Sequence, residues 1–137
     1  MSYLLDTNVL SELRRKAPDP HVQRWFSQRS AGAMYLSVLT LGEIRKGIDS
    51  LAESARRQRL SHWLEVDLPT YFSGRILSVD AAVADRWGRL VARIGLPLPA
   101  IDSLLAVTAM QHGLRLVTRN VRDMQGLGAE LINPWVD

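Results

Sequence analysis

Short apolar runs alternate with longer segments of helical period along the chain. The short runs are typical of strands and lie at residues 3–5, 34–36, 76–79, 114–118 and 130–132. Strands that alternate with helices usually form a parallel sheet covered on both faces. The pattern therefore predicts an α/β fold with a central, mostly parallel sheet of about five strands.

The segments of helical period carry recognisable start and stop signals. They cover approximately residues 7–16, 21–30, 37–48, 53–64, 80–94 and 100–112. Asp80 is a predicted N-cap and Gly95 a predicted helix end, while Pro99 precedes the last long helix and Gly113 follows it. No linker rich in Pro, Gly or Ser and no internal repeat divides the sequence, which predicts one domain over residues 1–137.

Composition narrows the possible chemistry. The 137 residues are 47% hydrophobic and 23% charged, which are ordinary values for a globular protein. Cysteine is absent, so disulfides, thiolate catalysis and cysteine-bound metals are excluded. No apolar run approaches the ~18 residues of a membrane span, and the N-terminus lacks the basic segment of a signal peptide. We therefore expect a cytoplasmic protein without a membrane partner.

The overall charge is a weak indication of nucleic-acid binding. The 17 basic and 14 acidic residues give a net charge of +3, and all bases except Lys16 and Lys46 are arginines. Arginine suits bidentate phosphate contacts, but so small an excess of basic over acidic residues does not by itself show that the protein binds nucleic acid. The arginines at 56, 57 and 59 are expected first as a solvated helix face and only second as contacts to an RNA backbone.

Four acids stand just after predicted strands or near the beginnings of predicted helices: Asp6, Glu43, Asp102 and Asp123. Each also has a purely structural interpretation. Asp6 could cap the helix after it, and Glu43 has the capping-box spacing from Thr40. Asp102 suits the first turn of a helix because of the helix dipole, and Asp123 could cap a short helix.

Taken together, the four acids are placed at one edge of the predicted sheet, where ligands bind in open α/β folds. Two carboxylates about 4 Å apart repel by roughly 4 kcal/mol at an effective dielectric near 20, so a converging cluster must bind protons or cations. Oxygen ligands suit Mg²⁺ or Mn²⁺, which serve phosphoryl chemistry. If the four share such a pocket, ten acids remain against 17 bases, which strengthens the indication of a nucleic-acid substrate.

Four ordered motifs resemble those of the PIN-domain ribonucleases, and more narrowly the VapC toxins of bacterial type II toxin–antitoxin modules, in their FitB-like branch. They are LLDTNVLSE at 4–12, LGEIRKG at 41–47, IDSLLAVTA at 101–109 and VTRN at 117–120. The resemblance implies a three-layer α/β/α fold and a metal-dependent endoribonuclease with Mg²⁺, or alternatively Mn²⁺, in an acidic pocket.

The resemblance also implies roles for individual residues. Asp6 and Asp102 match the acids most closely tied to the metal, and Glu43 matches a helix glutamate that completes the pocket. Asn8 and Thr118 match polar positions that orient these groups. Some relatives carry the fourth acid directly after Thr-Arg, where this chain has Asn120, and others three residues later, where it has Asp123. Asn120 can coordinate or hydrogen-bond but brings no charge, so the charge is assigned to Asp123, and both positions stay candidates for the fourth ligand.

The partners implied are an RNA substrate, a VapB-like antitoxin whose arginine enters the acidic pocket, operator DNA bound only through the antitoxin, and a second copy of the chain. Two alternatives stay open. The protein could be a catalytically weak PIN domain that serves mainly as the antitoxin-binding subunit of a DNA-binding regulatory complex. A phosphatase with an aspartate nucleophile is disfavoured, because Asn8 stands where its D-x-D motif needs a second acid.

Overall fold

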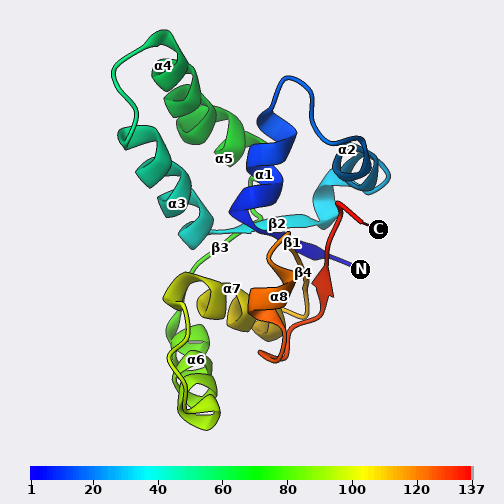
Figure 1. Ribbon diagram of the computed structural model, residues 1–137, viewed down its shortest axis with the longest axis vertical. Coiled ribbons are helices and arrows are strands. Elements are labelled where there is room, and N and C mark those ends of the chain that lie inside the picture. The colour runs from blue at the N-terminus through cyan, green and yellow to red at the C-terminus, as the bar shows by residue number, and fades with distance from the viewer. Residues whose placement is uncertain (137) are drawn as a thin grey trace.

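A five-stranded parallel sheet runs through the middle of the molecule (Figure 1). The computed structural model describes residues 1–136. Neighbouring strands pair in the order β3-β2-β1-β4-β5, so β1 is central. The strands are β1 (Tyr3–Leu5), β2 (Met34–Ser37), β3 (Ile76–Leu77), β4 (Arg115–Val117) and β5 (Leu131–Ile132). The predicted fold class is confirmed.

Helices cover both faces of the sheet and make the three layers. They are α1 (Thr7–Arg14), α2 (Pro20–Ser27), α3 (Val38–Asp49), α4 (Ala55–His62), α5 (Leu68–Tyr71), α6 (Ala81–Ile94), α7 (Ala100–Gln111) and α8 (Val121–Met124), with a 3₁₀ turn at Ala31–Ala33. In Figure 1, α1 to α5 lie above the sheet and α6 to α8 below it. None of the helices within residues 1–136 is long and apolar enough to cross a membrane.

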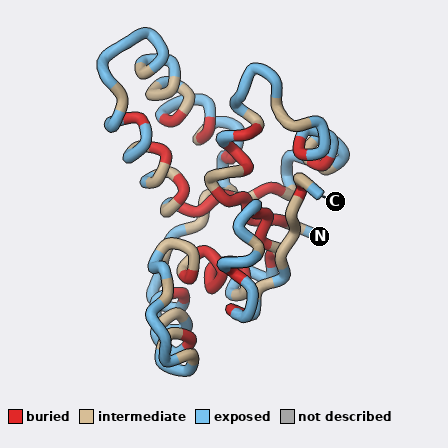
Figure 2. Tube along the Cα trace, in the orientation of Figure 1, coloured by how far each residue is buried: buried red, intermediate tan, exposed pale blue. Residues whose placement is uncertain are grey.

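Alternating side chains of β1 supply two separate cores. Tyr3 and Leu5 pack into the core under α1 to α5, whereas Leu4 packs into the core under α6 to α8. Each of the three is at most 7% exposed, as expected for a central strand buried on both faces. Figure 2 shows the buried positions gathered along this middle layer, with the outer ends of the long helices exposed.

Two predicted boundaries are wrong. The strand expected over 76–79 ends at Leu77, because Leu77 pairs with Ser37 and β2 ends there. The helix expected over 53–64 continues to Tyr71 through a π-helical segment, Trp63–Asp67, in which the Leu68 N–H donates to the Trp63 carbonyl. That wider turn leads into α5, whose second residue, Pro69, lacks an N–H to donate.

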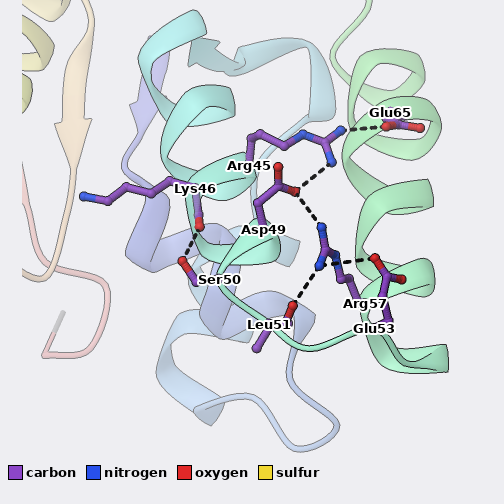
Figure 3. Close-up of polar contacts among 8 residues, drawn as sticks. All are labelled: Arg45, Lys46, Asp49, Ser50, Leu51, Glu53, Arg57 and Glu65. Atoms are coloured by element: carbon purple, nitrogen blue, oxygen red, sulfur yellow. Dashed lines mark hydrogen bonds and ion pairs between the residues drawn. The ribbon is translucent and has the colours of Figure 1, made fainter.

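An ion-pair network ties α3 to α4 and the π-helical segment (Figure 3). Arg45 pairs with Glu65 at 2.6 Å and with Asp49 at 3.6 Å, and Arg57 pairs with Asp49 at 3.6 Å and Glu53 at 3.3 Å. Exposed pairs of this kind contribute little to stability one at a time, about 0–1 kcal/mol each. They connect two helices that both line a groove described below.

Candidate active site

Asp6 lies directly after the central strand, at the edge of the sheet where the strands end. Its side chain is 4% exposed, and its Oδ1 accepts a hydrogen bond from the backbone N–H of Thr7 at 2.7 Å. Asp6 is therefore the N-cap of α1, as the structural interpretation of the sequence suggested. The cap engages Oδ1 alone, so Oδ2 is available for contacts with other parts of the chain.

Two polar residues orient Asp6, Thr118 just after β4 and Asn8 in α1. The Thr118 hydroxyl donates to Asp6 Oδ2 at 2.7 Å, and the Asn8 side-chain amide donates to the same oxygen at 3.3 Å. Thr118 Oγ1 in turn accepts from the backbone N–H of Asn120 at 3.0 Å, and Asn8 Oδ1 accepts from that of Arg119 at 3.2 Å. Asn8 and Thr118 thus hold Asp6 in place, as the resemblance implied.

Glu43 reaches the same site from α3, and its capping-box interpretation is wrong. The N-cap of α3 is Ser37, whose Oγ accepts from the Leu39 N–H at 3.0 Å, so Thr40 lies inside the helix. Glu43 Oε1 instead accepts the Thr7 hydroxyl at 2.7 Å. Because Thr7 also donates its backbone N–H to Asp6, this one residue connects the two acids.

The pKa values of the acids report their proximity. Burial raises the pKa of Asp6 above its ordinary value; the hydrogen bonds from Thr118 and Thr7 oppose this shift, and the charge of Glu43 adds to it. Burial also raises the pKa of Asp102, and the negative charges of Asp6 and Asp123 raise it further. The charges of the acids therefore act on one another in three pairs: Glu43 with Asp6, Asp6 with Asp102, and Asp102 with Asp123.

Asp102 and Asp123 come from helices on the opposite face of the sheet to Glu43. Asp102 is in the first turn of α7, as expected. Asp123 lies within the four-residue helix α8, and the residue at the cap position is Asn120, whose side chain makes no capping bond. The interpretation of Asp123 as a helix cap is therefore wrong, and its charge is free to act on Asp102.

The donor set suits a hard divalent cation in kind. No group of three or more His, Cys, Asp or Glu side chains within residues 1–136 is arranged so that it could hold a metal ion. Mg²⁺ does not need such a group, because it keeps several waters and commonly takes only one or two carboxylates from the protein. The buried Asp6 and the half-buried Asp102, which repel each other, fit that requirement, since a cation would offset the cost that raises their pKa values.

A groove of about 1000 Å³ begins at Thr7 and Glu43 and runs between α1, α3 and α4. Its apolar lining includes Ile44, Ile48, Leu51, Leu60 and Trp63, and its cationic lining comprises Arg14, Arg15, Lys16, Arg56 and Arg59. The three arginines of α4 therefore have different surroundings. Arg57 pairs with Asp49 of α3 and with Glu53, whereas Arg56 and Arg59 line the groove. The sequence showed these basic residues but not that they border one groove.

The PIN-domain family profile matches residues 3–125, which include all four acids. The chain belongs to the PIN-domain family. Similar proteins include the toxin FitB of Neisseria gonorrhoeae, 34% identical over 98% of this chain and 99% of FitB, and the VapC ribonuclease Y4jK of Sinorhizobium fredii, 32% identical over 96% of each chain. Within the PIN family the chain is thus a VapC/FitB-like toxin.

Solved structures agree with this assignment. The crystal structure of FitAcB from Neisseria gonorrhoeae superposes with a TM-score of 0.88 at 33% identity, covering 97% of this chain and 98% of the other. The structure of FitAB bound to an IR36 DNA fragment gives the same TM-score at 32% identity, covering 97% and 95%. The three-layer fold expected from the resemblance is confirmed.

Proposed function

We propose that the protein is a Mg²⁺-dependent endoribonuclease and the toxin of a type II toxin–antitoxin module. The observation that carries the proposal is the placement of Asp6. It is a buried carboxylate at the end of the central strand, held by Thr118 and exposed to the charges of other acids. Burying a repelling carboxylate is costly, and a fold that retains one in a network of donors is typical of a functional site.

In the proposed reaction water attacks an RNA phosphodiester in line with the leaving oxygen. Asp6 and Asp102 hold the cation, Mg²⁺ or Mn²⁺, which when bound supplies Lewis-acid stabilisation of the charge that develops on the phosphoryl oxygens. Glu43 orients the attacking water and accepts its proton at Oε2, because Oε1 is engaged by Thr7. Asp123 adds charge beside Asp102. The bond between phosphorus and the 3′ oxygen breaks and the leaving oxygen takes a proton from solvent water, so the expected products carry a 5′-phosphate and a 3′-hydroxyl.

The groove beside Glu43 supports a protein partner as well as an RNA substrate. The apolar and cationic residues that line it together fit an amphipathic segment with acidic side chains, the complement that an antitoxin would present. An arginine of that segment placed against Asp6 would substitute for the cation and block the site. The proposal includes operator DNA bound only through this complex, a homodimer, and action in the cytoplasm, where the RNA is.

The second candidate function is a catalytically weak, antitoxin-binding subunit of a DNA-binding regulatory complex. It is favoured by the similarity to FitAB, whose structure is that of a complex bound to DNA. The two functions are compatible in one protein. The bond from Thr7 to Glu43 and the bond from Thr118 to Asp6 favour catalysis, because a purely binding role gives no reason to keep both acids oriented.

The deciding experiment measures RNA cleavage by the antitoxin-free chain with Mg²⁺, with chelator, and with the variant Asp6→Asn. The matched control is Asp85→Asn, an exposed acid of α6 that pairs with Arg89. We expect cleavage by the wild type and by the control, and none with chelator or with Asp6→Asn. Cleavage that survives both treatments, or products ending in cyclic phosphate, would contradict the proposal.

A further inference from the structure

Arg119 has a fixed position beside the acids that the proposed reaction does not use. It follows Thr118, the residue that orients Asp6, and its backbone N–H donates to Asn8 Oδ1 at 3.2 Å. Its guanidinium lies over the ring of Trp135, with the central carbon 5.0 Å from the ring centroid. Backbone and side chain are therefore both restrained, although Arg119 is exposed.

Trp135 is itself placed by the fold. It follows β5, the edge strand that pairs with β4, so both residues lie beyond the same ends of neighbouring strands. Its backbone N–H donates to Asn133 Oδ1 at 2.9 Å, which fixes the turn leading away from β5. The stacking contact thus joins the segments that follow two adjacent strands.

The stacked arrangement leaves the hydrogen-bonding edge of Arg119 available. A guanidinium that stacks on an aromatic ring uses its face, while its N–H donors point outward in the plane. Arg119 makes no ion pair with any carboxylate of residues 1–136. An exposed guanidinium without an ion pair in this part of the chain leaves its donors accessible to an external anion.

We propose that Arg119 binds a backbone phosphate next to the scissile one, and that Trp135 is the positioning residue that holds it there. The proposal rests on the proposed nuclease function, because RNA supplies the phosphate. The acids and their cation would take the scissile phosphate, and a bidentate guanidinium at the β4–β5 side would set how the neighbouring nucleotide enters. The substrate would then be held on two sides of the cut.

The test uses binding, so that it does not depend on cleavage. Fluorescence anisotropy of a labelled single-stranded RNA, titrated over a range of salt concentrations, is measured for the Glu43→Gln chain with and without Arg119→Ala. Loss of one phosphate contact should weaken binding about tenfold and reduce the slope of log affinity against log salt by about 0.7. Arg119→Lys should restore most of the slope but not the full affinity, since lysine keeps the charge and loses the fork.

Two further variants separate this role from a structural one. Arg93→Ala, on α6, removes the same charge elsewhere and should leave affinity and slope unchanged. Trp135→Leu keeps the charge of Arg119 but removes its platform, so we expect weaker binding. If Arg119→Ala and Trp135→Leu lower the melting temperature while affinity and slope stay at control values, the pair only anchors the chain end and the proposal is wrong.

The outcome for Arg119 is distinguishable from the outcome for the nuclease function. Salt-dependent RNA binding that requires Arg119, in a wild-type chain that cleaves no RNA, supports the phosphate contact and contradicts catalysis. Cleavage by the wild type together with an unchanged salt slope in Arg119→Ala supports catalysis and overturns the phosphate contact. Failure of the Glu43→Gln chain to bind RNA at any salt concentration overturns the contact.

Discussion

The Thr118 hydroxyl donates a 2.7 Å hydrogen bond to Asp6 Oδ2, although the two residues are 112 positions apart in the chain. The contact exists because β1 and β4 are neighbours in the sheet and run parallel, so the residues that follow them meet at one edge. Both side chains are buried. Hydrogen-bond donors of this kind stabilise the charged form of a buried carboxylate, so the Thr118 hydroxyl helps to keep Asp6 in the charged form that binds a cation.

Replacing Thr118 with valine removes this donor while keeping the shape of the side chain. The pKa of Asp6 should rise further, because the Thr118 bond opposes the effect of burial. We expect RNA cleavage to fall about 10–100-fold, the usual cost of losing a residue that orients a metal ligand. Thr118→Ser keeps the hydroxyl and should recover most of the activity. Equal activity in the valine and serine variants would show that the bond has no role in the reaction.

The assignment of Glu43 to the attacking water leads to a second prediction. Glu43→Gln keeps the hydrogen bond from Thr7 but cannot accept a proton, so kcat should fall about 10²–10⁴-fold while Mg²⁺ affinity changes little. Thr7→Val, which frees Glu43 without removing its charge, should have a smaller effect. Single-turnover cleavage and isothermal titration with Mg²⁺ check the two parts. A large loss of Mg²⁺ affinity in Glu43→Gln would instead make Glu43 a metal ligand.

Most of the fold could be predicted from the sequence, because the local signals for helix and strand ends agree with the tertiary packing. Asp80 caps α6 by accepting the Val83 N–H, and Gly95 adopts a left-handed conformation at its end, as their residue types predict. The exceptions depend on contacts distant in sequence. The length of β3 follows from the end of β2, and the continuation past residue 64 accompanies burial of Leu64 and Leu68 in the core, a tertiary contact.

The site could be predicted from the sequence only in part, because it too depends on contacts between residues that are distant in the chain. The spacing of Thr40 and Glu43 fits a capping box, but the N-cap of the helix is Ser37, the first residue of its predicted range. The contact between Thr7 and Glu43 depends on how α1 and α3 lie beside each other. The stacking of Arg119 on Trp135 likewise depends on β4 and β5 being neighbours, and strand order is not encoded in a hydrophobic pattern.

The identity of the fourth acidic position gives a third prediction. Asp123 acts on the charge of Asp102, whereas Asn120 engages Thr118 through its backbone N–H, a bond that any residue except proline could make. Asp123→Asn should therefore weaken metal-dependent cleavage more than Asn120→Ala. Titrating cleavage against Mg²⁺ concentration should show a higher half-saturation for Asp123→Asn. Full activity in Asp123→Ala, with none in Asp6→Ala and Asp102→Ala, would remove Asp123 from the site.

The raised pKa values of Asp6 and Asp102 imply that, in the metal-free protein, these two groups contribute more stability at mildly acidic pH than at neutral pH. Between the ordinary pKa of an aspartate and the raised one, the folded chain binds protons that the unfolded chain has released, so the free energy of unfolding falls as pH increases through that window.

Asp102→Asn mimics the protonated form without losing a hydrogen bond, since Asp102 makes none with side chains or caps among the described residues. In excess chelator its melting temperature should exceed that of the wild type at pH 7, and the difference should vanish near pH 4. Saturating Mg²⁺ should reverse the order at pH 7, because binding stabilises only the chain that keeps the carboxylate. A wild type that is more stable than Asp102→Asn at pH 7 in chelator would mean that the acids do not repel one another in the folded protein.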